Sequence, residues 1–141
     1  MATIDASNLV LGRMASSVAK RVLRGESIDI INGEKSVIIG RREDILEKFK
    51  IWRSMQAKGN PETSGPKYPR MPDRIVKRTI RGMLPHRCTR GMMALKRVKV
   101  WIGVPKDIDV SNIEILEKAK AKDNVSKMSI EEVSRNLGAR W

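Results

Sequence analysis

The sequence predicts an α/β fold in one domain of 141 residues, in which helices alternate with the strands of a mostly parallel sheet. Short apolar runs bounded by turn residues alternate with segments in which apolar residues recur every three or four positions. Hydrophobic residues make up 40% of the chain and are spread along it, which is typical of a folded chain rather than a disordered one. A chain of this length can also bury a substantial core.

The first half of the chain predicts the order strand, helix, strand, strand, helix. Apolar residues within 11–23 recur at i, i+3, i+4 and i+7, which is the spacing of one helix face. Strand candidates flank this helix at residues 2–6 (ATIDA) and 27–32 (SIDIIN), and Asn32 with the glycine after it predicts a turn. The nearly continuous apolar run at 36–40 (SVIIG) predicts a strand that is buried on both faces.

A second helix is predicted to begin at residue 42, because the acids at the next two positions suit a helix N-terminus. Its apolar side would carry Ile45, Phe49, Trp52 and Met55. Four of the chain's six prolines then fall between residues 58 and 72, so this Pro/Gly-rich stretch is predicted to be a loop. A loop of this length inside one domain is usually functional or partly disordered.

The second half of the chain predicts a helix at 73–84, a short helix at 91–98 and a strand at 98–105 that ends at a proline. Residues 112–122 (NIEILEKAKAK) predict a further short helix. Ser129 begins a capping-box sequence, so we expect the last helix to start there and to end near the glycine of NLGAR.

Positive charge is concentrated in one part of the chain. The formal net charge is +13, from 29 Lys and Arg against 16 Asp and Glu. Residues 67–99 hold 11 of these cations and one acid, so they contribute +10, and the rest of the chain is close to neutral. Such a balance attracts polyanions, with nucleic acid as the first candidate and an anionic membrane as the second.

The predicted helix at 73–84 is amphipathic, and its polar side is purely cationic. At 100° per residue its apolar residues fall opposite a cluster made of Arg74, Lys77, Arg78 and Arg81. Like charges at these spacings repel by roughly 0.2–0.5 kcal/mol per pair, and a solvated helix face usually mixes signs. A basic face can also serve solubility alone. We interpret the cluster as a surface whose missing negative charge comes from a polyanion.

The turn after this helix extends the basic surface. A glycine and a proline break the helix, and the basic candidates on the turn and on the next helix are His86, Arg87, Arg90, Lys96 and Arg97. Arginine can fork two hydrogen bonds onto a phosphate, and Gly82 and Gly91 would let the backbone approach a nucleic acid closely. The polar side of the helix at 11–23 offers a second surface, made of Arg13, Lys20, Arg21 and Arg24.

Residues that could support catalysis or bind a metal are sparse. His86 is the only histidine, and with Cys88 it offers two ligands where a zinc site needs three or four. The chain has no GxxxxGK[ST] phosphate loop, and NLVLGRMAS has one glycine where a dinucleotide-binding fingerprint needs three. We therefore expect no enzyme, no metal and no cofactor.

The large apolar side chains are expected to serve packing. We expect the methionines at 83, 92 and 93 to lie in the core and the tryptophans at 52, 101 and 141 to be packing residues. Five aromatic residues in all argue against a sheet that stacks bases. No apolar run approaches the length of a membrane span, MATIDASNLV lacks the features of a signal peptide, and one cysteine forms no internal disulfide. These features fit a cytoplasmic protein.

The stretch RMPDRIVKRTIRGMLPHRCTRGMMALKRVKVWIGVP closely resembles the signature region of the universal large-subunit ribosomal protein thirteen family, in its archaeal and eukaryotic form. The most specific part is RTIRGMLPH with the following RG, AL and GVP. IDASNLVLGRMASSVAKRVLRG and IINGEKSVIIG resemble the family's opening and its second and third strands, so the resemblance covers nearly the whole chain. The long C-terminal extension typical of eukaryotic members is missing, so the chain looks archaeal.

The resemblance implies a three-layer α/β/α domain around a small, mostly parallel four-stranded sheet. It implies a structural role without catalysis: binding 23S-type ribosomal RNA, supporting assembly of the large subunit and contacting neighbouring ribosomal proteins. No membrane or small-molecule substrate would be involved. Residues 81–86 fall on the family motif, and Arg74, Arg78, Arg87 and Arg90 fall on basic positions around it. The loop before the motif varies within the family, and it adds the candidates Lys67 and Arg70.

Other function classes stay open on the residues alone. The charge permits a DNA-binding or chromatin protein, although no helix-turn-helix signature with a reading helix is visible. A nucleotide-using enzyme could occupy the same scaffold, and the missing phosphate loop counts against it. Membrane-surface binding is the weakest alternative, because no helix pairs a basic face with bulky exposed aromatics.

Overall fold

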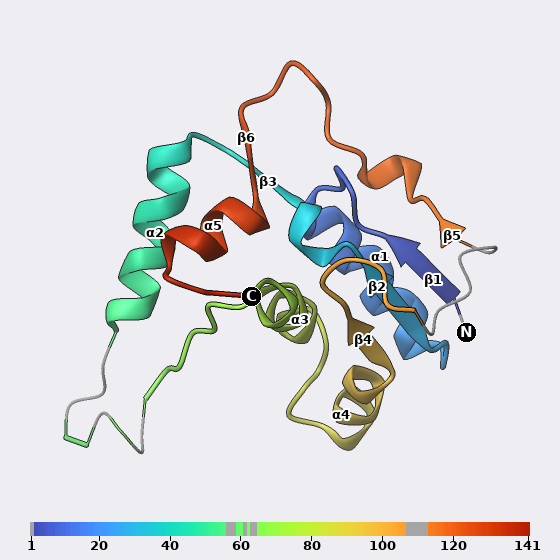
Figure 1. The fold of residues 1–141 in the computed structure, drawn as a ribbon. Coiled ribbons are helices and arrows are strands. Elements are labelled where there is room, and N and C mark those ends of the chain that lie inside the picture. The colour runs from blue at the N-terminus through green and yellow to red at the C-terminus, as the bar shows by residue number, and fades with distance from the viewer. Residues whose placement is uncertain (1, 56–58, 61, 63–64, 107–112) are drawn as a thin grey trace.

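The computed structural model describes residues 2–55, 59–60, 62, 65–106 and 113–141 (Figure 1). The described elements follow in the order β1 (Ala2–Asp5), α1 (Leu11–Leu23), β2 (Ile28–Ile31), the 3₁₀ helix η1 (Gly33–Lys35), β3 (Val37–Ile39), α2 (Arg42–Ser54), α3 (Pro72–Gly82), α4 (Thr89–Lys96), β4 (Val98–Val100), β5 (Ile113–Glu114), the 3₁₀ helix η3 (Glu117–Ala119), β6 (Lys127–Ser129) and α5 (Ile130–Asn136).

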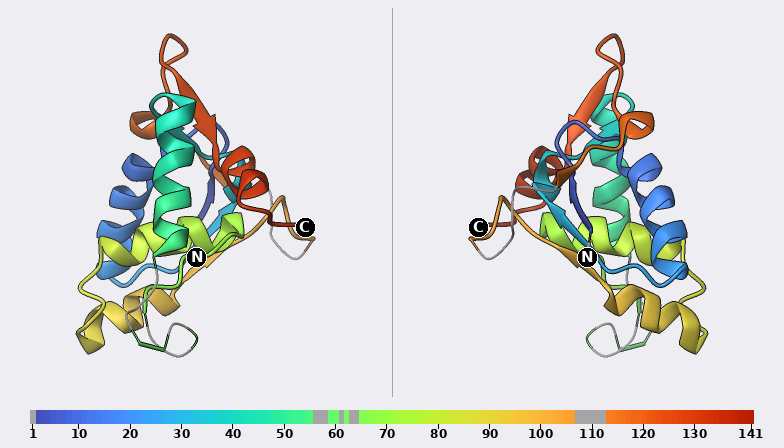
Figure 2. Two further views of the ribbon diagram at one scale, coloured as in Figure 1. Left: turned by 90° about the vertical axis from the view of Figure 1, so that its left-hand side faces the viewer. Right: turned by 90° about the vertical axis from the view of Figure 1, so that its right-hand side faces the viewer.

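Four strands form a parallel sheet in the order β4–β2–β1–β5. At its centre Ile4 of β1 lies opposite Ile30 of β2. The predicted mostly parallel four-stranded sheet is therefore confirmed. Figure 2 shows α1 and α5 on opposite sides of β1, an arrangement consistent with a three-layer α/β/α domain.

The core lies between the sheet and the helices α1 and α3. The inner face of α1 is fully covered, with buried residues Leu11, Met14, Ala15, Val18, Ala19 and Val22. These side chains share one cluster with Ile28 of the sheet and with Val76 and Ile80 of α3. Burying one large aliphatic side chain stabilises a fold by roughly 1.5–3 kcal/mol. The helix predicted at 11–23 is confirmed, and its packing fixes α3 against the sheet.

β3 leaves the parallel sheet and pairs antiparallel with β6. The departure begins at Asn32, whose φ of 52° turns the chain out of the direction of β2. Gly33 follows in close contact with β4, where a Cβ atom would come within 2.9 Å of the Val100 side chain. Ile39 is 39% exposed, so the predicted burial of this strand on both faces is wrong. A run of apolar residues does not show which of them face outward.

The second predicted helix is confirmed as α2, although its apolar side is only partly covered. Ile45 is buried, Phe49 and Trp52 are half-buried, and Met55 follows the helix and is exposed. In the predicted loop, the described residues before Pro72 form no helix or strand, and Pro72 itself begins α3. The remaining residues of that loop (58, 61 and 63–64) lie outside the described residues.

The C-terminal region differs from its prediction in one element. The helix predicted at 112–122 is wrong: its first residue lies outside the described residues, and the others form β5, η3 and irregular chain. Backbone pairing of β5 with β1 takes the place of a helix there. The last predicted helix is confirmed as α5, because the Ser129 Oγ accepts a hydrogen bond from the Glu132 N–H at 3.2 Å.

Several large apolar side chains expected in the interior are exposed. The predictions for Met83, Met92 and Met93 are wrong, with exposed fractions of 42%, 49% and 52%. Trp101 and Trp141 are 37% and 46% exposed, and their predicted packing role stays a prediction. In α4 the small residues 91 and 94 face the core, which turns the two methionines between them outward. Among the described helices, none has the length and apolar character needed to cross a bilayer.

Candidate nucleic-acid interface

The four cations predicted on one side of a helix lie together on α3. Pro72 begins the helix at a position where the missing N–H needs no intrahelical partner. The inner side of α3 carries the buried residues Ile75, Val76 and Ile80. Its outer side carries what we call the basic ridge, which consists of Arg74, Lys77, Arg78 and Arg81. The helix predicted at 73–84 is thus confirmed, with its end at Gly82.

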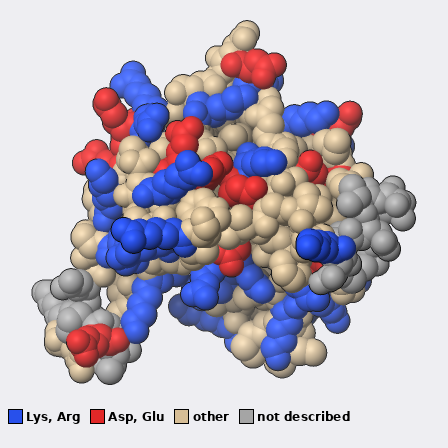
Figure 3. Space-filling model, in the orientation of Figure 1, with Lys and Arg blue, Asp and Glu red and all other residues tan. Residues whose placement is uncertain are grey.

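No cation between residues 67 and 99 forms an ion pair with a carboxylate in the described part of the chain. The ion pairs of the described residues involve other cations, which are Arg21, Arg42, Lys120, Lys127 and Arg135. Figure 3 shows Lys and Arg over the whole visible face, with Asp and Glu among them mainly in the upper part and few over α3 and α4. The surface is therefore available to a polyanion.

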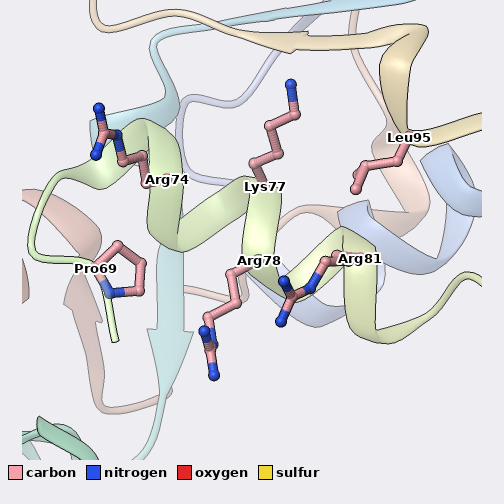
Figure 4. Close-up of a pocket in the computed structure, with 6 residues that line it drawn as sticks. All are labelled: Pro69, Arg74, Lys77, Arg78, Arg81 and Leu95. Atoms are coloured by element: carbon pink, nitrogen blue, oxygen red, sulfur yellow. The ribbon is translucent and has the colours of Figure 1, made fainter. Parts of the chain in front are cut away.

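The basic ridge lines a shallow hollow of about 250 Å³ together with Pro69 and Leu95 (Figure 4). Figure 4 shows the cationic side chains fanning out from α3, with Pro69 on the preceding loop and Leu95 on α4. The surface that lines the hollow is mainly apolar, although four of its six residues carry a positive charge. Such a hollow can hold a phosphate and its sugar between several cations.

Arg78 differs from the rest of the basic ridge because other side chains hold it in place. Its guanidinium lies 3.9 Å from the centre of the Tyr68 ring. The Tyr68 ring stacks on Trp52 at 5.4 Å and 18°, and the Lys48 Nζ lies 4.9 Å from the Trp52 ring centre. We call these four residues the aromatic stack. It ties the loop at 65–71 to α2 and α3, and so it fixes Pro69 beside the basic ridge.

The sequence did not indicate this role for Tyr68, and it suggested only packing for Trp52. The one available signal is the position of the chain's single tyrosine within PKYPR, between two candidate cations. Those cations, Lys67 and Arg70, are both exposed. The loop that carries them is anchored, since the Lys67 Nζ donates to the Glu62 carbonyl at 2.8 Å and the Ser134 Oγ donates to the Arg70 carbonyl at 2.5 Å.

The turn after α3 presents its predicted candidates to solvent. Backbone hydrogen bonds fold the turn, from the His86 N–H to the Leu84 carbonyl at 2.7 Å and from the Cys88 N–H to the Pro85 carbonyl at 3.0 Å. The exposed candidates are His86, Arg87 and Arg90. Gly82 is also exposed, and a Cβ built there would have no neighbour within 4 Å. Its backbone is therefore open to a close partner, and the approach of a nucleic acid to it stays a prediction.

Gly91 has a different role from the one predicted. It is buried, and a Cβ atom at this position would lie 2.1 Å from the Pro85 carbonyl oxygen. The backbone of α4 therefore packs on the turn after α3, and the predicted approach of Gly91 to a nucleic acid is wrong. This close contact orients α4, which presents Lys96 in its last turn and Arg97 just after it. The predicted short helix at 91–98 is confirmed, with α4 beginning two residues earlier.

Of the four candidate cations on α1 and at its C-terminal end, three are exposed and one is bound. Arg13, Lys20 and Arg24 are exposed. Arg21 is half-buried, and it donates to Glu114 at 2.5 Å and to Glu26 at 2.7 Å. The hydrogen bonds that Arg21 donates to Glu114 and then to Glu26 raise its pKa. Arg21 therefore joins α1 to β5, and its charge is largely compensated.

No group of three or more His, Cys, Asp or Glu residues is placed to hold a metal ion within the described ranges. His86 and Cys88 are both exposed. The described surface offers a cluster of cations, and binding of an anionic polymer is the chemistry that this arrangement supports best.

Comparisons with known proteins connect this surface to a family. The family model described as Ribosomal protein L13 matches residues 1–107, a range that includes the basic ridge, the turn after α3 and α4. The large ribosomal subunit protein uL13 of Methanocaldococcus jannaschii is 46% identical over 142 aligned residues, and the alignment covers the full length of both chains. That of Methanosphaera stadtmanae is 44% identical over 138 residues, which are 98% of this chain and 97% of the relative. The Picrophilus torridus protein of the same name is 45% identical over 141 residues.

Proposed function

Because this chain belongs to the ribosomal protein L13 family, we propose that it is a structural constituent of the large ribosomal subunit that binds 23S-type ribosomal RNA. It supports assembly of the subunit in the cytoplasm, and neighbouring ribosomal proteins are its other partners. The role involves no catalysis, no membrane and no small-molecule substrate. One observation supports RNA binding above all: the cations between residues 67 and 99 have no carboxylate partner among the described residues.

The basic ridge and the turn after α3 contact RNA phosphates. An Arg presents a planar fork of donors that fits a phosphate, whereas Lys acts as a point charge. Arg78 is held by Tyr68 on one face and donates from Nη1 to the Lys67 carbonyl at 2.9 Å. Its orientation is fixed before RNA arrives, so binding costs less side-chain entropy there.

The proposed contacts extend from the basic ridge over the turn, α4, the loop before α3 and the outer side of α1. Beside the basic ridge, the contact residues are Arg13, Lys20, Arg24, Lys67, Arg70, Gly82, His86, Arg87, Arg90, Lys96 and Arg97. Arg21 acts by holding α1 against β5. Side chains spread over such a surface meet the RNA backbone at several points, so recognition is mainly by RNA shape, with few base-edge contacts.

Binding measured against salt concentration tests this function. The chain is titrated with fragments of large-subunit ribosomal RNA and with duplex DNA of equal length. Six to ten phosphate contacts should reduce affinity by roughly 10³ to 10⁵ between 50 and 200 mM salt. An RNA fragment that stays bound at the upper salt concentration while the DNA is released supports a specific RNA site. Equal loss on both polymers contradicts it, and saturable ATP or NAD binding at micromolar concentration would favour an enzyme.

A further inference from the structure

A second surface of the molecule has a chemistry unlike that of the basic ridge. A groove of about 480 Å³ lies between the start of α1, β3 and α2. Its lining is mainly apolar and includes Leu11, Val37, Ile39, Ile45, Phe49 and Trp52. We call it the apolar groove. A large apolar hollow on a soluble domain generally marks a binding surface.

The charge around the apolar groove does not suit RNA. Residues 37–55 carry five Lys or Arg and three Asp or Glu, a net +2, where residues 67–99 carry +10. Nine of these 19 residues are Val, Ile, Leu, Phe, Trp or Met. Protein interfaces are enriched in aromatic residues, Met and Arg, whereas RNA binding depends on an excess of cations. The composition therefore favours a polypeptide as the occupant.

The apolar surface continues from the groove along α2. Ile51 is 49% exposed and lines a neighbouring hollow with Trp52, which also lines the apolar groove. Met55, just after the helix, is 44% exposed. Single exposed apolar residues are ordinary, but here they extend one groove. A partner that covers the groove can therefore bury more apolar area on the same side of α2.

The backbone of β3 offers a second, independent feature. The Ile130 N–H donates to the Ser36 carbonyl at 2.8 Å, and the Gly40 N–H donates to the Ser126 carbonyl at 3.0 Å. In an antiparallel pair every second residue bonds to the partner strand, and residues 36 and 40 do so here. The backbone groups of residues 37 and 39 therefore point away from β6. The Val37 N–H donates on that side to the Leu9 carbonyl at 2.9 Å, whereas the described residues supply no backbone partner for Ile39. An extended chain can pair with such an edge.

We propose that the apolar groove docks an extended, mainly apolar segment of a neighbouring protein in the large ribosomal subunit. The inference rests on the proposed function, because it takes the neighbour from the assembled particle. Apolar side chains of the segment fill the groove, and its backbone pairs with Ile39. The lining of the groove carries two cations, Arg41 and Lys48, and one acid, Asp44. A carboxylate of the docked segment complements the positive charge that Asp44 leaves unbalanced.

Photo-crosslinking in assembled large subunits tests the occupant. p-Benzoylphenylalanine replaces Ile39 in one variant and Ile115 in the control, since Ile115 is 55% exposed and does not line the groove. The expected result is a ribonuclease-resistant adduct from position 39 with one protein, mapped to an apolar segment that contains an acidic residue. No such adduct should form from position 115. An RNA adduct, an adduct with this chain or a second copy of it, or no adduct at all overturns the proposal.

Competition for incorporation gives a second readout. Ile39→Asp and Ile115→Asp are each expressed beside the unmodified chain, and the share of each in purified large subunits is measured. Ile39→Asp should be incorporated about tenfold less, because it loses one buried aliphatic contact and adds a carboxylate to the groove. Both variants should bind the RNA fragments equally. Equal incorporation overturns the groove proposal alone, whereas absence of the unmodified chain from large subunits contradicts the proposed function as well.

Discussion

The Arg78 guanidinium lies 3.9 Å from the centre of the Tyr68 ring. Its Nη1 donates a hydrogen bond to the carbonyl of Lys67, the residue before Tyr68, at 2.9 Å. This pair joins the basic ridge to the loop that presents two further cations. The Tyr68 ring rests in turn on Trp52 of α2. The relative placement of loop and ridge therefore depends on side-chain stacking, which makes it open to single substitutions.

Replacing Tyr68 by Ala should weaken RNA binding without removing a phosphate contact. The variant loses a cation–π contact and an aromatic pair, so the free energy of unfolding should fall by roughly 1–2 kcal/mol. RNA affinity should decrease while its salt slope stays unchanged, because Tyr68 supplies no charge. Tyr68→Phe keeps the ring and serves as the control. Denaturant unfolding and salt-dependent binding measure both effects, and equal affinities of the two variants would contradict the positioning role.

Arg81 and Arg78 should respond differently to alanine. Arg81 is exposed and has no carboxylate partner among the described residues, so Arg81→Ala should lower the salt slope by about one unit. Its stability should change by less than about 0.5 kcal/mol. Arg78→Ala should reduce both slope and stability, since Arg78 also holds the loop. Arg81→Lys retains the charge as a control, and an unchanged slope in both alanine variants would exclude the basic ridge as a contact surface.

Gly91→Ala should be strongly destabilising. Its Cβ would lie 2.1 Å from the backbone oxygen of Pro85, so either the turn or α4 must move. Overpacking of this kind costs about 1–3 kcal/mol, and a backbone neighbour places the cost at the upper end. The matched control is Gly82→Ala, at a position with no neighbour within 4 Å, where stability should be kept or raised. Thermal unfolding compares them, and equal melting temperatures would contradict the close packing.

Gly82→Ala also tests the RNA interface. If RNA approaches the open backbone at Gly82, a methyl group there should lower RNA affinity while the protein stays folded. Binding to ribosomal RNA fragments at fixed salt concentration measures this effect. An affinity equal to that of the unmodified chain would place the RNA backbone away from Gly82.

The contact between Arg21 and Glu114 should make stability depend on pH. The hydrogen bonds from Arg21 lower the pKa of Glu114 below its ordinary value. The carboxylate therefore stabilises the fold above its unfolded pKa near 4.5, and this contribution is lost as the pH falls through the lower folded pKa. The Glu114 side chain is 50% exposed, so the effect should stay below about 1 kcal/mol. Unfolding of the native chain and of Glu114→Gln from pH 7 to pH 3 measures it, and parallel curves would contradict it.

The regular elements with strong side-chain periodicity were predictable from the sequence. The helices α1 and α3 each bury one apolar face against the core, so their patterns reflect tertiary packing directly. The cap of α5 was predictable for another reason, since the Ser129 hydroxyl and the Glu132 amide are only three residues apart. The basic ridge followed from the same periodicity, because cations excluded from the core gather on the opposite side of the helix.

Features that depend on contacts between distant segments were not predictable in this way. Residues 112–122 have a helix-like pattern, but Ile113 and Glu114 pair with β1, and the sequence does not show that an open strand edge is near. The exposure of Met92 and Met93 follows from the contact of Gly91 with Pro85, which selects the face of α4 that is buried. The aromatic stack joins residues from three segments, and no local spacing indicates that they meet.

The strand order also has a consequence for the timing of folding. β1 pairs on one side with β2, which follows soon in the sequence, and on the other side with β5, where Thr3 lies opposite Ile113. Closing so long a loop is slow, and that edge of β1 stays open until β5 has been synthesised. By then the residues of α3 and α4 have already been made. We expect the nascent chain to present an open strand edge and a strongly cationic surface together, so an early encounter with RNA would limit its aggregation.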